Sequence, residues 1–251
     1  MMDKNDESLD IKIRDSGDDL SQAIFSSKFA TPLVQVSAYG RDVFIKDESC
    51  NPYNTIKDRK ISALLSRFKK KPAPDWIVCT TSFNVGASLR MHYKEVPQST
   101  KVAVVTDLDF KVHRDWFSDK GIQSHFIDLQ EEINLVGEDI YRDNFDIDPN
   151  DVIYDISDGV DFSRTLGYKS LASEIALQVA ESQGVRSYSD LERIMFEKVV
   201  LFVPFGSGDI LIGMHAGFRS LGLNPRYTIV TIPNNPLGGL DQFKTAKWGR
   251  L

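Results

Sequence analysis

Short apolar runs alternate along this chain with segments whose apolar residues recur at helical spacing. In the first 150 residues, this pattern predicts strands at 43–45, 76–80, 101–106 and 124–127, and helices at 56–68, 85–93, 111–120 and 130–141. Further along, it predicts helices at 166–183 and 210–221 and strands at 198–204 and 227–232. Strand–helix alternation is typical of a parallel sheet covered on both faces. We therefore expect an α/β fold.

A polar stretch that contains Pro149 interrupts this pattern and marks a boundary between two lobes. We expect a smaller lobe at 72–150 and a larger lobe formed by 22–71 together with 151–251. Residues 1–21 are acidic and lack aromatic side chains, which is the composition of a loosely ordered arm.

Composition and charge narrow the classes of partner. The net charge of −6 argues against nucleic acid, because a phosphate backbone favours a basic surface. No apolar run approaches the about 20 residues needed to cross a bilayer, so no membrane partner is expected. The two cysteines are too few for a disulfide framework and indicate the cytoplasm. The four histidines lack metal-ligand spacing, so no metal is expected.

Lys57 stands at the start of the predicted helix 56–68, behind a turn at Asn51–Asn54. An aldehyde cofactor needs a lysine that can lose its proton and form a Schiff base. The positive end of a helix disfavours an ammonium ion and therefore favours the neutral amine. Taken by itself, however, Lys57 is better interpreted as a surface lysine.

Two other loops lie between a predicted strand and a predicted helix. In Gly206-Ser207-Gly208-Asp209, glycines allow backbone amides to converge at a helix N-terminus, where a phosphate fits. The alternative is a tight turn between strand and helix. Thr81–Gly86 offers hydroxyls, the Asn84 amide and backbone N–H groups that suit a small carboxylate. Its alternative is an ordinary Ser/Thr helix cap.

The three segments gain meaning together. Open α/β sheets bind ligands at strand-to-helix junctions of this kind. An amine, a carboxylate cradle and a phosphate cradle are also what an enzyme needs to hold pyridoxal phosphate (PLP) and act on an amino acid. The sequence therefore predicts PLP as cofactor and an amino acid as substrate.

The order and the amino-acid sequences of these segments resemble those of the fold type II PLP enzymes, the group of threonine synthase, cysteine synthase and tryptophan synthase β. The segments that carry the resemblance are Thr31–Leu33, Ile45–Ser49, Asn51–Pro52, Ile56–Arg59, Thr81–Asn84, Gly167–Ala176 and Val203–Leu211. The last of these looks most like the threonine synthase form of the phosphate loop. The resemblance implies a threonine synthase-like elimination or replacement on an amino acid, and we also expect a homodimer.

The resemblance also implies a role for each residue of the three segments. Lys57 falls at the Schiff-base lysine, and Asn84 at the residue that contacts the ring hydroxyl. Backbone amides of Gly206, Ser207, Gly208 and Asp209 would bind the phosphate. Thr81, Ser82 and Val85 would bind the substrate carboxylate.

The chain departs from the family pattern at Phe83, where the carboxylate loop normally carries glycine. A bulky side chain there would obstruct the substrate, reshape the loop or point away. Tyr53-Asn54-Thr55 replaces a glycine-containing turn, and no residue is assigned to face the pyridine nitrogen. Phe83 and the missing C-terminal part of the family pattern favour an alternative, a shortened, non-catalytic paralogue that binds a ligand or a partner, whereas Lys57 and the glycine loop favour an enzyme.

Overall fold

The structure is a computed structural model that describes residues 13, 17–21, 23, 30–38, 40–69, 72–81, 83–129, 138–157, 167–205 and 208–231. The chain forms two compact units. One combines the residues up to Ile56 with Thr165–Phe205 and Asp209–Thr231, and the other consists mainly of Lys57–Arg164.

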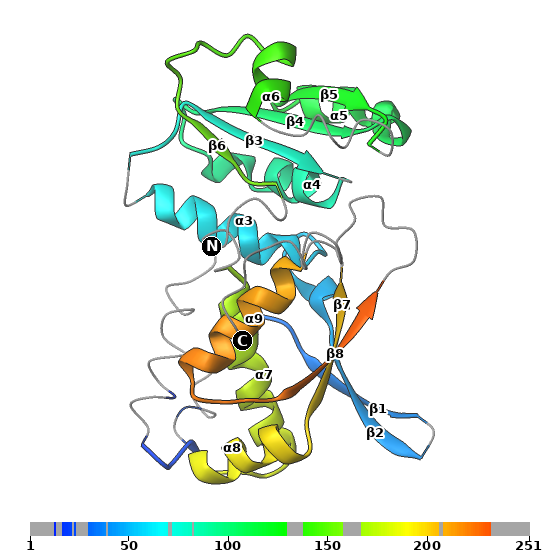
Figure 1. Cartoon of the computed structure of the whole chain (residues 1–251), viewed down its shortest axis with the longest axis vertical. Helices are drawn as coiled ribbons and strands as arrows, with labels where there is room; N and C mark the ends of the chain where they lie inside the picture. Colours follow the sequence, from blue (N-terminus) through cyan, green and yellow to red (C-terminus); the bar gives the residue numbers. More distant parts are fainter. Residues whose placement is uncertain are drawn as a thin grey trace. The chain divides into compact units, whose positions relative to one another are not determined.

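The Lys57–Arg164 unit is built on a parallel sheet with the strand order β5-β4-β3-β6 among the described residues (Figure 1). Its strands are β3 (Trp76–Thr81), β4 (Lys101–Asp107), β5 (Gln123–Ile127) and β6 (Ile153–Asp155). The central strands β3 and β4 are almost continuously apolar and buried, as expected for a parallel sheet with helices on both faces.

Helices cover both faces of this sheet. The elements that surround it are α3 (Lys57–Phe68), α4 (Asn84–Met91), η2 (Tyr93–Glu95), η3 (Leu108–His113), α5 (Arg114–Ser118) and α6 (Glu138–Asn144). Side chains of α3, α4 and α5 pack on one face, against Ile77 and Val104 among others. The α6 side chains Ile140 and Tyr141 pack on the other face. The predicted apolar face of the first helix is confirmed, because Ile61, Leu64, Leu65 and Phe68 are buried.

The other unit combines two-stranded sheets with a group of helices. Within the described residues, β1 (Leu33–Ala38) and β2 (Arg41–Lys46) form an antiparallel hairpin that precedes η1 (Glu48–Cys50), and β7 (Val200–Phe205) pairs in parallel with β8 (Arg226–Thr231). Its helices are α7 (Lys169–Ser182), α8 (Tyr188–Glu197) and α9 (Asp209–Ser220). Helices α7 and α9 touch closely at Gly217, where a Cβ would lie 2.6 Å from the Lys169 carbonyl oxygen.

The α/β class and the parallel sheet are confirmed, with differences in detail. The sequence pattern missed β1, β6 and α8. The predicted helix 111–120 begins as the 3-10 segment η3 and becomes α-helical at Arg114, and residues 130–137 of the next helix lie outside the described part. The sequence placed 57–71 in the larger lobe, whereas α3 groups with the sheet because its apolar face packs there. The lobe boundaries stay a prediction.

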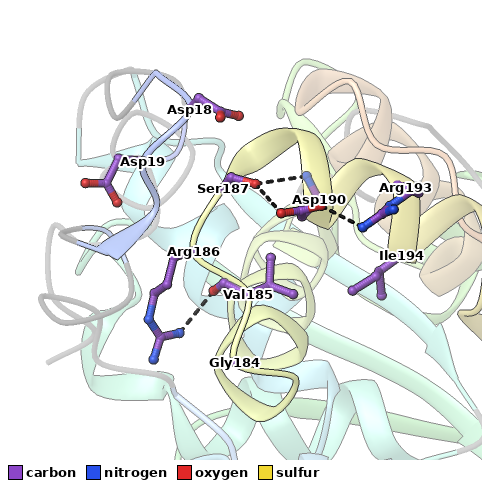
Figure 2. A pocket seen from close by; sticks show the side chains of 9 residues that line it. All are labelled: Asp18, Asp19, Gly184, Val185, Arg186, Ser187, Asp190, Arg193 and Ile194. Atoms are coloured by element: carbon purple, nitrogen blue, oxygen red, sulfur yellow. Dashed lines mark hydrogen bonds and ion pairs between the residues drawn. The ribbon is translucent and has the colours of Figure 1, made fainter.

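The end of the predicted loose arm is tied to the turn between α7 and α8. The Leu20 N–H donates to the Arg186 carbonyl at 2.7 Å, and the Tyr188 N–H donates to the Asp18 carbonyl at 2.7 Å. An open pocket of about 620 Å³ lies beside this turn. Figure 2 shows the residues that line it: Asp18, Asp19, Gly184, Val185, Arg186, Ser187, Asp190, Arg193 and Ile194. In the part of the chain that the structure describes, no helix has both the length and the apolarity to span a membrane.

Candidate functional site

Lys57 is the first residue of α3 and is half-buried. The turn before it is closed by a hydrogen bond from the Asn54 N–H to the Asn51 carbonyl, at 2.9 Å. Asn54 has a φ of 62°, in the left-handed region that asparagine tolerates better than most residues. Asparagine thus allows this turn to adopt a conformation that most residues avoid.

A polar network anchors the segment that leads to Lys57. Its contacts were not predicted from the sequence. The Lys46 ammonium donates to Glu174 at 2.7 Å, to Gln178 at 2.8 Å and to the Thr31 carbonyl at 2.6 Å. The Thr31 hydroxyl donates to Glu48 Oε1 at 2.6 Å. Because Glu174 and Gln178 belong to α7, this helix fixes the loop after β2.

Glu48 connects this network to the turn before Lys57. Its second carboxylate oxygen accepts a hydrogen bond from the Asn51 side chain at 2.9 Å, and its carbonyl accepts another at 2.8 Å. Glu48 and Asn51, two residues of the family-like segments, therefore have a structural function: they fix the chain six residues before Lys57.

The loop after β3 is organised by Thr81. Its hydroxyl accepts hydrogen bonds from the Phe83 N–H at 3.2 Å and from the Val85 N–H at 3.4 Å. Asn84 is exposed at the start of α4, whereas the Val85 side chain is buried in the core. Ser82 lies outside the described residues. Thr81 thus makes helix-cap contacts, the alternative interpretation of this loop, and the carboxylate-binding roles stay a prediction.

Phe83 adopts a backbone conformation that is rare for a residue with a side chain. Its φ is 104° and its ψ is −50°, and such backbone strain costs about 1–3 kcal/mol. Its ring stacks on Phe110 at 4.7 Å and on Trp116 at 5.7 Å between centroids, and it meets Phe117 edge-on at 6.0 Å. The ring therefore lies in an aromatic cluster with η3 and α5, while the backbone keeps a conformation that suits the glycine of the family.

The third predicted loop is described from Gly208 onward, since Gly206 and Ser207 lie outside the described residues. Gly208 is buried and has a φ of 89°, a conformation that favours glycine. Asp209, also buried, begins α9 directly after it. A left-handed glycine before a twelve-residue helix fits the backbone cradle that a phosphate needs.

The predicted site residues divide between the two units. Lys57, Thr81, Asn84, Val85 and Gly208 belong to one unit, and Asp209 is grouped with the other. In the first unit, the helices that begin with Lys57 and Asn84 are joined by a hydrogen bond from the Ser88 hydroxyl to Asp58 Oδ1, at 2.6 Å. The donor set of a primary amine, an exposed amide and a glycine turn matches the chemistry of PLP.

A second buried polar group lies at the ends of β3 and β6 and was missed by sequence reasoning. The Tyr141 hydroxyl is 2.9 Å from Thr80 Oγ1 and 3.0 Å from Ser157 Oγ. Ser157 Oγ accepts from the Thr80 N–H at 2.7 Å and donates to Asp155 at 2.6 Å. Burial raises the pKa of Tyr141, which keeps its phenol protonated. These residues are far apart in sequence, so no local motif signals them.

The fold defines a class: the α/β architecture of the fold type II PLP enzymes. Residues 24–246 match the family described as "Pyridoxal-phosphate dependent enzyme", and the chain belongs to this family. The cofactor of the family is PLP, as predicted. Within the described residues, no group of three or more His, Cys, Asp or Glu side chains is arranged to hold a metal ion.

Solved structures show the same fold at low sequence identity. O-ureido-L-serine synthase is 19% identical over 83% of this chain and 61% of its own, with a TM-score of 0.56. A hydrogen sulfide-producing enzyme from Fusobacterium nucleatum is 18% identical over 83% and 65%, with a TM-score of 0.58. Cysteine synthase from Entamoeba histolytica is 19% identical over 78% and 56%, with a TM-score of 0.51.

The chain spans about 60% of the length of the O-ureido-L-serine synthase chains that it matches. No curated protein matches the sequence significantly. These likenesses show the fold, and the preference for threonine synthase among its members stays a prediction.

Proposed function

We propose that this protein catalyses a PLP-dependent elimination or replacement on an amino acid. The observation that carries the proposal is the position of Lys57: a half-buried amine at the start of α3, in a chain that belongs to a PLP-dependent family. When bound, the cofactor supplies the electron sink, and the protein supplies binding and orientation. Lys57 would hold the cofactor aldehyde and move the α-proton of the substrate.

The remaining roles follow the predicted segments. Asn84, exposed at the start of α4, would donate to the ring hydroxyl. Backbone amides of Gly206–Asp209 would bind the phosphate at the N-terminus of α9. Thr81, Ser82 and Val85 would hold the substrate carboxylate, and the Val85 N–H and the Thr81 hydroxyl, now bonded to each other, would bond to the ligand instead.

Two substrate classes are to be compared. The sequence of the phosphate loop favours a threonine synthase-like reaction on a phosphorylated hydroxy-amino acid. The solved structures favour an O-substituted serine, because they include O-ureido-L-serine synthase and cysteine synthase. Turnover of protein with added PLP on each class, followed by amino-acid analysis, decides between them. Lys57→Ala should abolish turnover, and Lys120→Ala, at an exposed lysine, should not.

One observation favours the alternative of a non-catalytic interaction protein. Phe202 is 69% exposed and Val200 is 38% exposed on β7, although parallel sheets are normally covered on both faces. Such a face suits contact with another polypeptide, which includes a second copy in the expected homodimer. Bound PLP without turnover on either substrate class would support this alternative. The low cysteine count supports a cytoplasmic location for either function.

A further inference from the structure

A buried contact between α3 and α4 includes the residue next to Lys57. Asp58 is fully buried, and its Oδ1 accepts the hydrogen bond from the Ser88 hydroxyl at 2.6 Å. His92 Nε2 lies 3.7 Å from the same oxygen. Whatever fixes Asp58 also fixes the first turn of α3, and Lys57 begins that turn.

His92 connects this turn to a second carboxylate. The imidazole is buried at the C-terminal end of α4, and its Nδ1 is 2.9 Å from Glu95 Oε1 in η2. The other oxygen of Glu95 accepts from the Lys69 ammonium at 3.3 Å, directly after the end of α3. The charged groups around the imidazole thus include Asp58 on α3 and Glu95 on η2, with Lys69 beyond Glu95.

The charges give this contact a pH range. Burial alone would lower the pKa of His92, but the hydrogen bond with Glu95 and the negative charges of Glu95 and of Asp58, 3.7 Å from Nε2, outweigh it and raise that pKa. Burial alone would raise the pKa of Glu95, but hydrogen bonds from His92 and Lys69 outweigh it and lower that pKa.

The signs follow from linkage. The contribution of His92 is fully present below the ordinary histidine pKa of about 6.5 and is lost as the pH rises through the raised value. The contribution of Glu95 is present above the ordinary pKa of about 4.3 and is lost as the pH falls through the lowered value. The contact is complete between these limits.

We propose that His92 is a positioning residue for Lys57: as an imidazolium between Asp58 and Glu95, it ties the first turn of α3 to the end of α4. The proposal rests on the proposed function in so far as Lys57 holds the cofactor. Loss of the imidazolium proton loosens the turn and exposes the Lys57 amine further.

Limited acylation of lysines with a soluble succinimidyl ester tests this positioning without any cofactor. Peptide mass spectrometry gives the rate at Lys57 relative to Lys120, an exposed lysine of the same unit. We expect this ratio to rise several-fold with pH as His92 loses its proton. In His92→Gln the ratio should be high and independent of pH. His125→Gln, at a half-buried histidine of the same unit, should keep the wild-type profile.

Glu95→Gln provides a second variant if His92→Gln does not fold. Removing this carboxylate lowers the pKa of His92, so the rise in the ratio should move to lower pH. A flat wild-type profile, a pH-dependent rise that persists in His92→Gln, or an unshifted rise in Glu95→Gln would overturn the positioning role. Failure of PLP to bind would count against the proposed function alone, since the acylation assay uses no cofactor.

Discussion

The backbone of Phe83 leads to an unusual prediction: at this position, at the start of α4, glycine should give a more stable protein than alanine. Phe83→Ala removes the ring contacts but keeps a Cβ at a φ of 104°. Phe83→Gly removes the same contacts and also relieves the strain. A fully buried Phe→Ala change costs about 3–5 kcal/mol, so the half-buried Phe83 ring should contribute roughly half of that.

The difference in the free energy of unfolding between Phe83→Gly and Phe83→Ala measures the contribution of the backbone conformation alone. Strain relief contributes about 1–3 kcal/mol, and the greater freedom of glycine in the unfolded chain offsets roughly 0.5–1 kcal/mol. Phe83→Gly should therefore be more stable than Phe83→Ala by about 1 kcal/mol. Urea unfolding followed by tryptophan fluorescence measures both midpoints.

A matched control lies one turn further along. Ala87→Gly changes alanine to glycine inside α4 and should destabilise by about 0.5–1 kcal/mol, the ordinary direction. If Phe83→Gly is equally or less stable than Phe83→Ala, the aromatic cluster does not hold a strained backbone, and the account of this loop is wrong.

Two further predictions concern packing in the other unit. Gly217→Ala should destabilise by about 1–3 kcal/mol and lower the thermal midpoint, because its Cβ would lie 2.6 Å from the Lys169 carbonyl oxygen and 2.7 Å from the Ala172 Cβ; an unchanged midpoint would contradict the close approach of α7 and α9. Glu174→Ala should cost about 3–5 kcal/mol in chemical denaturation, because it removes the buried carboxylate that neutralises Lys46, whose side chain is only 10% exposed. A cost similar to that of an exposed ion pair, below about 1 kcal/mol, would show that Lys46 does not need it.

Local patterns predicted the elements that carry strong periodicity. The apolar runs were sufficient to predict β3 and β4, because strands buried on both faces are continuously apolar. The apolar stripe was sufficient to predict α3, because a helix buried on one face repeats its apolar residues at helical spacing. Helix α8 was missed although its buried residues Leu191 and Met195 lie at helical spacing. The Ser187 hydroxyl accepts a hydrogen bond from the Asp190 N–H, and this cap was the signal that could have revealed it.

The sequence predicted the segments that form the candidate site, but it did not predict the contacts that hold these segments in place. Residue types and strand–helix order pointed to Lys57 and to the loops near Asn84 and Gly208. The network from Lys46 to Glu174 joins residues 128 positions apart, and no local pattern encodes such a contact. The positive φ of Phe83 also escapes sequence reasoning, because residue preferences indicate the opposite conformation.

The attachment of the cofactor to Lys57 is the central claim, and a single labelling measurement tests it most directly. Protein incubated with PLP is reduced with borohydride, and the modified peptide is identified by mass spectrometry. The account predicts a phosphopyridoxyl group on Lys57, a yellow protein before reduction, and neither in Lys57→Ala, while Lys120→Ala behaves like the wild type. A wild-type protein that stays colourless with added PLP, or a stoichiometric label on another lysine, would contradict it.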